Sequence, residues 1–144
     1  MKARDIMTKN PETATPGTTV ADVARMMRDL DVGIVPVVNG DKLLGVITDR
    51  DITIRFTAEG LDPAGTSVDA FVSPNPVVVS PNDSVEKVRE LMADKQIRRV
   101  LVTEGDNLVG VISIGDVAIK GKSNDTEVGE ALQDISEPTD LSRN

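Results

Sequence analysis

Residues 20–51 read VADVARMMRDLDVGIVPVVNGDKLLGVITDRD, and this stretch decides the fold because the chain contains it twice. Residues 85–116 read VEKVRELMADKQIRRVLVTEGDNLVGVISIGD and align with it without a gap, at an offset of 65 residues (85 − 20). About a third of the paired positions are identical, and most others exchange one aliphatic residue for another. The register continues backward, pairing Asn10-Pro11 with Asn75-Pro76. The chain is therefore predicted to hold two copies of one structural unit.

Each copy begins with the pattern of an amphipathic helix. Apolar residues recur at intervals of three and four residues, which places them on one helix face. In the first copy, Thr19 and Asp22 are placed to form a capping box at the helix start. In the second copy, we expect Asp83 to cap the helix, with Glu86 reaching back to it.

Two short runs of β-branched residues follow this helix, at residues 34–38 and 43–48 in the first copy and at residues 99–103 and 108–113 in the second. Asn39-Gly40-Asp41 separates the first pair, and its Asn-Gly dipeptide suits a tight hairpin turn. A second helix is expected directly after Thr48 and directly after Ser113. The first of these helices should end near Gly60.

Residues 13–15 and 77–80 are the expected leading strands, so each unit reads strand, helix, strand, strand, helix. One such unit alone would leave apolar helix and sheet faces uncovered. We therefore expect an α+β fold in which two pseudo-symmetric β-α-β-β-α units pack as one module.

The expected domains are the first unit with its linker at residues 1–66, the second unit at 67–122 and an acidic C-terminal segment at 123–144. In that last segment Val128, Leu132 and Ile135 are spaced as a single apolar stripe. This spacing predicts a short docked helix at residues 126–136, followed by a frayed tail. The alternative is a wholly disordered acidic tail.

The composition excludes several classes of function. The 144 residues include no Cys and no His, which removes disulfides, thiolate nucleophiles, Cys/His zinc sites and triads with an imidazole base. The formal net charge of −8 argues against nucleic-acid partners, since the molecule as a whole repels phosphate backbones. Two Phe, no Tyr and no Trp leave no aromatic platform for stacking bases. We therefore expect no catalytic residues, no metal site and no enzyme activity.

The chain also lacks the patterns of an exported or membrane protein. Its first residues have no continuous apolar run of a secretory signal. No segment approaches the roughly 18 consecutive apolar residues of a membrane span. A cytoplasmic location without a membrane partner is expected.

The most informative local pattern joins the last strand of each copy to the following helix. Residues 45–51 read GVITDRD and residues 110–116 read GVISIGD, so each strand leads to a hydroxyl residue and then to an acid three residues on. One interpretation is a capping box, in which Thr48 or Ser113 accepts from a backbone N–H and the acid returns the bond. The other is an anion site at a helix N-terminus, with the acid accepting bonds from both hydroxyls of a ribose.

The repeated unit that ends in G-h-h-[ST]-x-x-D resembles the CBS (cystathionine beta-synthase) domain family, and two units in tandem resemble a Bateman module. The resemblance covers nearly all of residues 3–120. The stretch TDRDI, followed downstream by GLDP, is also similar to small stand-alone bacterial CBS-pair proteins of the hypoxic-response type, which have no attached enzyme.

This resemblance implies a non-catalytic regulatory module that acts as an energy or stress sensor. Its implied ligand is an adenosyl compound, usually AMP, ADP or ATP and less often S-adenosylmethionine, and it needs no obligatory cofactor. Such modules commonly form homodimers and act on a protein target, which this sequence does not name.

The resemblance also implies roles for individual residues. Asp51 and Asp116 would hold the ribose hydroxyls, and Thr48 and Ser113 would lie beside the ribose and the phosphate. Adenine would lie among backbone and aliphatic groups in two clefts, formed by Ile34, Val35, Pro36 and Val37 in one and by Val100, Leu101 and Val102 in the other.

Basic residues distinguish the two copies. Relatives that bind phosphates often have basic residues just before the third element, where this sequence has Arg98-Arg99 in the second copy and Gly33-Ile34 in the first. Arg50 lies in the motif of the first copy, at the place that Gly115 takes in the second. We expect at least one cleft to bind an adenine nucleotide with its phosphates on Arg98, Arg99 or Arg50. The alternative for the arginine pair is a solvated surface position.

A ligand-free dimerisation or interaction module is the alternative function. In that case both [ST]-x-x-D boxes serve only as helix caps. Substitution of Asp116 by Ala, alongside Asp51→Ala, separates the two functions. Loss of a cap costs about 0.5–2 kcal/mol of stability and leaves the nucleotide response unchanged, whereas loss of a ribose contact weakens binding as well.

Overall fold

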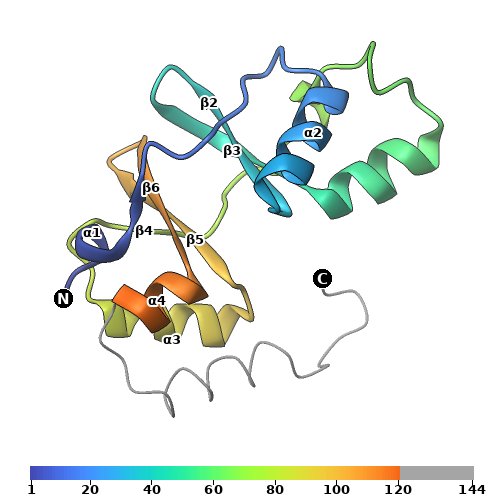
Figure 1. The fold of residues 1–144 in the computed structure, drawn as a ribbon. Coiled ribbons are helices and arrows are strands. Elements are labelled where there is room, and N and C mark those ends of the chain that lie inside the picture. Colours follow the sequence, from blue (N-terminus) through green and yellow to red (C-terminus); the bar gives the residue numbers. More distant parts are fainter. Residues whose placement is uncertain (121–144) are drawn as a thin grey trace. The chain divides into compact units, whose positions relative to one another are not determined.

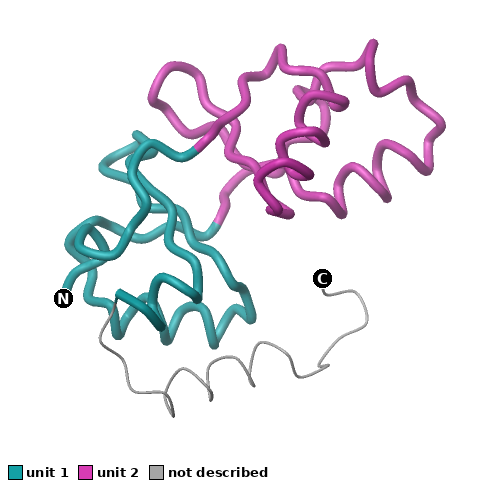
Figure 2. Tube along the Cα trace, viewed as in Figure 1, with its two compact units in different colours: residues 1–11, 77–144 teal, residues 12–76 magenta. Residues whose placement is uncertain are grey.

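The computed structural model describes residues 1–120, and the helix expected at residues 126–136 lies outside the described residues. The chain forms two compact units, each of which contains one copy of the repeat (Figure 2). We call Glu12–Pro76 the repeat-1 unit, and Met1–Pro11 together with the chain from Val77 the repeat-2 unit. Both units mix helices with strands, which confirms the expected α+β class.

The repeat-1 unit contains α2 (Val20–Leu30), β2 (Ile34–Asn39), β3 (Lys42–Thr48), the π-helix η1 (Asp51–Phe56) and the 3-10 helices η2 (Thr57–Glu59) and η3 (Val68–Phe71) (Figure 1). β2 and β3 form an antiparallel hairpin in which Asn39 pairs with Lys42. The tight turn therefore consists of Gly40 and Asp41 rather than the expected Asn-Gly pair. Gly40 has a φ of 62°, and such a positive φ is what a two-residue hairpin turn requires. Gly60 ends η2 in the left-handed conformation, as expected.

The repeat-2 unit contains α1 (Ala3–Ile6), β1 (Thr8–Lys9), β4 (Val78–Val79), α3 (Val85–Lys95), β5 (Arg99–Glu104), β6 (Asn107–Ser113) and α4 (Ile114–Lys120) (Figure 1). β5 and β6 form the equivalent hairpin, with Arg99 opposite Ser113 and a turn at Gly105 and Asp106. β4 pairs with β5 in parallel, and β1 pairs with β6 antiparallel. The hairpins of both units confirm the strands predicted from the β-branched runs.

The leading strands are shorter than expected. In the repeat-1 unit Ala14 makes a single parallel bridge to Val37. Its N–H donates to the Pro36 carbonyl, and its own carbonyl accepts from the Val38 N–H, both at 2.9 Å. The next ladder bond would need an N–H from Pro16, which proline lacks, so this strand cannot continue.

The first amphipathic helix has its expected capping bond, and the second does not. Thr19 Oγ1 accepts from the Asp22 N–H at 3.1 Å. In α3 the cap is Ser84, whose Oγ accepts from the Lys87 N–H at 3.1 Å. The prediction that Asp83 caps this helix is wrong, because the capping residue directly precedes the first helical residue and Asp83 lies one position too early.

Each copy of the repeat packs against the segment that precedes the other copy in the sequence. In the repeat-1 unit, Val46 of β3 and Ser73 exchange two backbone hydrogen bonds, of 3.0 and 2.7 Å. In the repeat-2 unit, β1 pairs with β6, with Thr8 opposite Val111. Thr8 and Ser73 are equivalent positions at the offset of 65 residues, so the two units use their preceding segments in the same way. The compact units thus divide the chain differently from the expected domain boundary between residues 66 and 67.

These preceding segments explain why each motif begins with glycine. A Cβ on Gly45 would lie 2.4 Å from the Ser73 carbonyl oxygen. A Cβ on Gly110 would lie 2.6 Å from Met7 Sδ. A side chain at either position would force the neighbouring segment to move, at Gly45 its backbone and at Gly110 chiefly the Met7 side chain.

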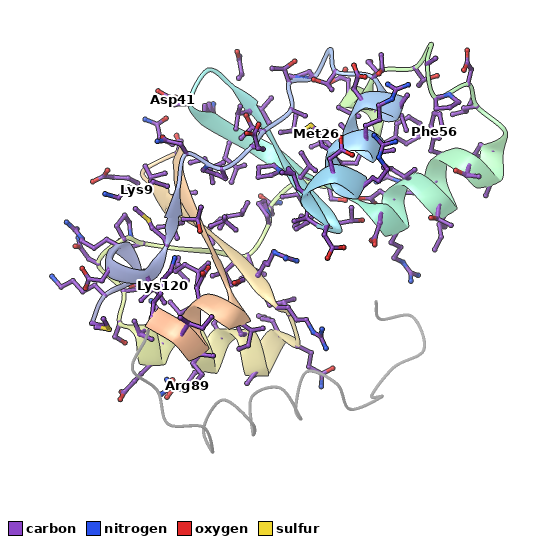
Figure 3. All side chains as sticks on the ribbon, in the orientation of Figure 1. Lys9, Met26, Asp41, Phe56, Arg89 and Lys120 are labelled. Carbon is purple, nitrogen blue, oxygen red and sulfur yellow. The ribbon has the colours of Figure 1, made fainter. Side chains whose placement is uncertain are left out.

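Each unit has its own apolar core. The core of the repeat-1 unit includes Val23, Val35, Val37, Ile47 and Phe56, and that of the repeat-2 unit includes Ile6, Val88, Met92, Val100, Val102 and Ile112. Phe56, which Figure 3 labels, packs edge to face on Phe71 with 5.4 Å between ring centroids. Both phenylalanines of the chain are therefore buried in the repeat-1 unit. Among residues 1–120, no helix has the length and apolar character to cross a bilayer.

Candidate functional site

The two [ST]-x-x-D motifs adopt the same local structure in both units. Where β3 ends, the Thr48 N–H donates to Asp51 Oδ2 and the Asp51 N–H donates to Thr48 Oγ1, both at 3.0 Å. Where β6 ends, the Ser113 N–H donates to Asp116 Oδ2 at 2.8 Å and the Asp116 N–H donates to Ser113 Oγ at 3.1 Å. Both motifs are therefore capping boxes, and each box fixes the position of its carboxylate.

Beyond these boxes, the two carboxylates have different neighbours. Asp51 also accepts from Ser73 Oγ, at 3.2 Å to Oδ2, and from Arg55 Nη1, at 3.4 Å to Oδ1. Asp116 has an ion pair with Lys120, whose Nζ lies 3.5 Å from Oδ1. The Asp51 side chain is 12% exposed and the Asp116 side chain is 18% exposed.

The backbone places Arg98 and Arg99 beside the motif of the repeat-2 unit. The Ile114 N–H, at the start of α4, donates to the Arg98 carbonyl at 2.8 Å. Arg99 is directly opposite Ser113 in the β5–β6 ladder. Arg98 is exposed and Arg99 is half-buried, and within residues 1–120 neither guanidinium has a salt-bridge partner. Two cationic side chains therefore start from the same corner as the Asp116 carboxylate.

The equivalent corner of the repeat-1 unit lacks the arginine pair and has a carboxylate there instead. The Asp49 N–H donates to the Gly33 carbonyl at 2.9 Å, which is the same backbone bond. Gly33 replaces Arg98, however, and the Asp49 carboxylate lies against it: a Cβ on Gly33 would be 2.9 Å from Asp49 Oδ2. The half-buried Arg50 follows Asp49 in the chain. Asp49 was not among the expected site residues, although its replacement by Ile114 in the second copy is visible in the sequence.

The residues expected around adenine divide between the two faces of the hairpins. The side chains of Val35, Val37, Val100 and Val102 belong to the apolar cores, with 1% exposure or less. Ile34, Pro36 and Leu101 lie outside these two clusters, because side chains alternate between the faces of a strand. Pro36 and Leu101 are nevertheless buried, Leu101 with 3% exposure, and Ile34 is half-buried. Among the expected aliphatic contacts, only the side chain of Ile34 is partly exposed.

The two repeats, their hairpins and their paired motifs define a tandem CBS protein. The CBS domain model matches residues 3–57 and 68–120, and the chain belongs to the CBS domain family. It is 41% identical over 133 residues to the CBS domain-containing protein YhcV of Bacillus subtilis (strain 168), covering 92% of this chain and 94% of that protein.

The fold is shared with solved structures of other proteins. Hypoxic Response Protein I with two coordinated zinc ions is 34% identical, with a TM-score of 0.72 over 82% of this chain and 97% of that one. CBSX2 in complex with AMP is 24% identical, with a TM-score of 0.69 over 81% of this chain and 92% of that one. These comparisons confirm the resemblance to stand-alone CBS-pair proteins of the hypoxic-response type.

Proposed function

We propose that this protein is a cytoplasmic, non-catalytic regulatory module that binds an adenine nucleotide (AMP, ADP or ATP) beside its [ST]-x-x-D motifs and acts as an energy or stress sensor. The observation that supports this proposal best is the corner formed by Asp116, Arg98 and Arg99. A fixed, partly exposed carboxylate and two cations without a salt-bridge partner among residues 1–120 start from one short region of backbone.

Each part of a nucleotide has a chemical counterpart at this corner. The ribose hydroxyls are donors, and Asp116 is an acceptor held in place by Ser113. The phosphates are anions, and Arg98 and Arg99 provide guanidinium donors in a geometry that suits phosphate oxygens. The base would lie against backbone groups of β5, because both phenylalanines and Leu101 are buried. CBSX2, which has the same fold, holds AMP.

The phosphate contact is assigned to side chains rather than to the start of a helix. α4 has seven residues, and its first turn already contains the Asp116 carboxylate. A carboxylate repels phosphate, so the nucleotide must present its sugar to Asp116 and its phosphates to the arginines. In this orientation, removal of the ribose 2′-hydroxyl removes a hydrogen bond to Asp116, so binding of the 2′-deoxy nucleotide tests the aspartate contact.

Calorimetric titration tests the proposal. AMP, ADP and ATP are titrated into the wild-type chain, and the nucleotide that binds is compared with its 2′-deoxy form. We expect the deoxy form and Asp116→Asn each to weaken binding at least about tenfold, which corresponds to about 1.4 kcal/mol. Asp106→Asn, in the exposed β5–β6 turn, is the matched control and should bind as the wild type does. Absence of heat with all three nucleotides at millimolar concentration refutes the proposal.

We also propose that the chain forms a homodimer. Ile54 and Ile119 occupy equivalent positions of the two repeats, and their exposed fractions are 49% and 84%. Large apolar side chains exposed at a repeated position favour contact with a second copy. Multi-angle light scattering should give twice the mass of the chain, and the mass of a single chain would contradict a dimer.

A further inference from the structure

The two motif aspartates differ in how many of their acceptor positions are already occupied. An ionised carboxylate has about four positions at which it can accept a hydrogen bond. Asp51 receives three donors, from the Thr48 N–H, the Ser73 hydroxyl and the Arg55 guanidinium. Asp116 receives the Ser113 N–H and faces the Lys120 ammonium.

This difference matters because a ribose presents two neighbouring hydroxyls. Holding both through one carboxylate needs two vacant acceptor positions. By this count Asp116 has two such positions and Asp51 has one. A ribose could therefore bind Asp51 through both hydroxyls only by displacing one of the donors that the protein itself supplies.

The donor that separates the two aspartates most clearly is Ser73. Its backbone is fixed on β3 by two hydrogen bonds with Val46, and Gly45 allows this close approach. Its hydroxyl therefore has a defined position beside Asp51. The equivalent residue of the repeat-2 unit is Thr8, which pairs with β6 in the same way but is exposed and makes no hydrogen bond to Asp116.

The charged residues around the two motifs also favour binding at Asp116 over binding at Asp51. The Asp49 carboxylate lies against Gly33 at the corner of the repeat-1 unit. The repeat-2 unit has Arg98 at the equivalent backbone position and the apolar Ile114 in place of Asp49. The half-buried Arg50 follows Asp49, so the repeat-1 corner holds charges of both signs, whereas the repeat-2 corner has the pair Arg98 and Arg99. A nucleotide phosphate is therefore attracted more strongly to the repeat-2 corner.

We infer that Ser73 is a specificity-determining residue: its hydroxyl occupies Asp51, so that the chain binds one nucleotide, at Asp116, and Asp51 serves the fold. This inference rests on the proposed function. It assigns unequal roles to two motifs that the sequence presents as equivalent.

The stoichiometry of binding tests the inference, with AMP and ATP as probes. The wild-type chain should bind one nucleotide per chain. Asp51→Asn retains an acceptor for the Thr48 N–H, so it should leave the dissociation constant within about twofold. Asp116→Asn should weaken binding at least about tenfold. Two nucleotides per wild-type chain, or equal losses in the two variants, would overturn the inference while leaving the proposed function standing. Failure of AMP, ADP and ATP alike to bind the wild type would instead refute the proposed function.

A gain-of-binding variant tests Ser73 directly. Ser73→Ala removes one donor and leaves Asp51 with two vacant acceptor positions. Adenosine is the probe, because it has the ribose but no phosphate for Asp49 to repel. We expect the stoichiometry to rise from one adenosine in the wild type to two in Ser73→Ala, and Ser67→Ala, which precedes η3, should remain at one. An unchanged stoichiometry in Ser73→Ala would contradict the role given to this hydroxyl.

Discussion

Substitution of Gly45 and of Gly110, the first residues of the two motifs, should lower the stability of the fold by different amounts. A Cβ on Gly45 would lie 2.4 Å from the Ser73 carbonyl oxygen and 2.6 Å from Val72 Cγ1. A Cβ on Gly110 would lie 2.6 Å from Met7 Sδ and 3.0 Å from the Thr8 carbonyl oxygen. At Gly45 the closest neighbour is the Ser73 backbone, which two hydrogen bonds with Val46 hold in place. At Gly110 the closest neighbour is the end of the flexible Met7 side chain.

Overpacking of this kind typically costs about 1–3 kcal/mol, and the cost rises when the neighbour cannot move. We therefore expect Gly45→Ala to cost about 3 kcal/mol and Gly110→Ala about 1 kcal/mol. For a chain of this size each kcal/mol lowers the melting temperature by roughly 2–4 °C. The expected decreases are about 6–12 °C for Gly45→Ala and about 2–4 °C for Gly110→Ala.

Thermal unfolding followed by circular dichroism measures both values, with Gly17→Ala as the control. Nothing lies within 4 Å of a Cβ at Gly17, so the control should unfold at the wild-type temperature or slightly above it. A Gly45→Ala variant that melts with the control would refute the reasoning, because the segment around Ser73 would then be free to move away from β3. A larger loss for Gly110→Ala than for Gly45→Ala would refute the ranking of the two contacts.

Two further predictions concern the start of α3. Ser84→Ala removes the observed cap and should cost about 0.5–2 kcal/mol in urea unfolding, and a cost close to zero would contradict the assignment of Ser84 as the cap. The Ser80 N–H and, after it, Lys87 lower the pKa of Asp83 in the folded state. The Asp83 carboxylate therefore stabilises the fold above its unfolded pKa. This contribution is lost as the pH falls through the folded pKa. Wild type should therefore be more stable than Asp83→Asn at pH 7 and approach it below about pH 4, the ordinary range of an aspartate; a difference that is independent of pH would contradict this role.

The secondary structure was largely predictable because its signals are local. The β-branched runs of each copy became β2, β3, β5 and β6, and the turn glycines lie where the sequence places them. The error at Asp83 also arose locally, since the sequence offers Asp83 and Ser84 as neighbouring cap residues and the pattern does not fix the first helical residue. The capping bonds of Asp51 and Asp116 were predictable for the same reason, because donor and acceptor are three residues apart.

The surroundings of those two carboxylates were not predictable in this way. Ser73 is 22 residues from Asp51 in the sequence and reaches it only because the preceding segment of the other copy packs on β3. Asp49 is adjacent to the motif, yet its position against Gly33 depends on how β2 meets the start of η1.

The amino-acid sequence by itself determined the duplicated unit, the order of its elements and the two aspartates, because periodicity, turn glycines and caps depend on residues a few positions apart. Only the tertiary structure decided which aspartate keeps room for two further donors. That property depends on side chains brought together from distant positions, and two copies with nearly the same sequence pattern can differ in it through a single hydroxyl such as that of Ser73.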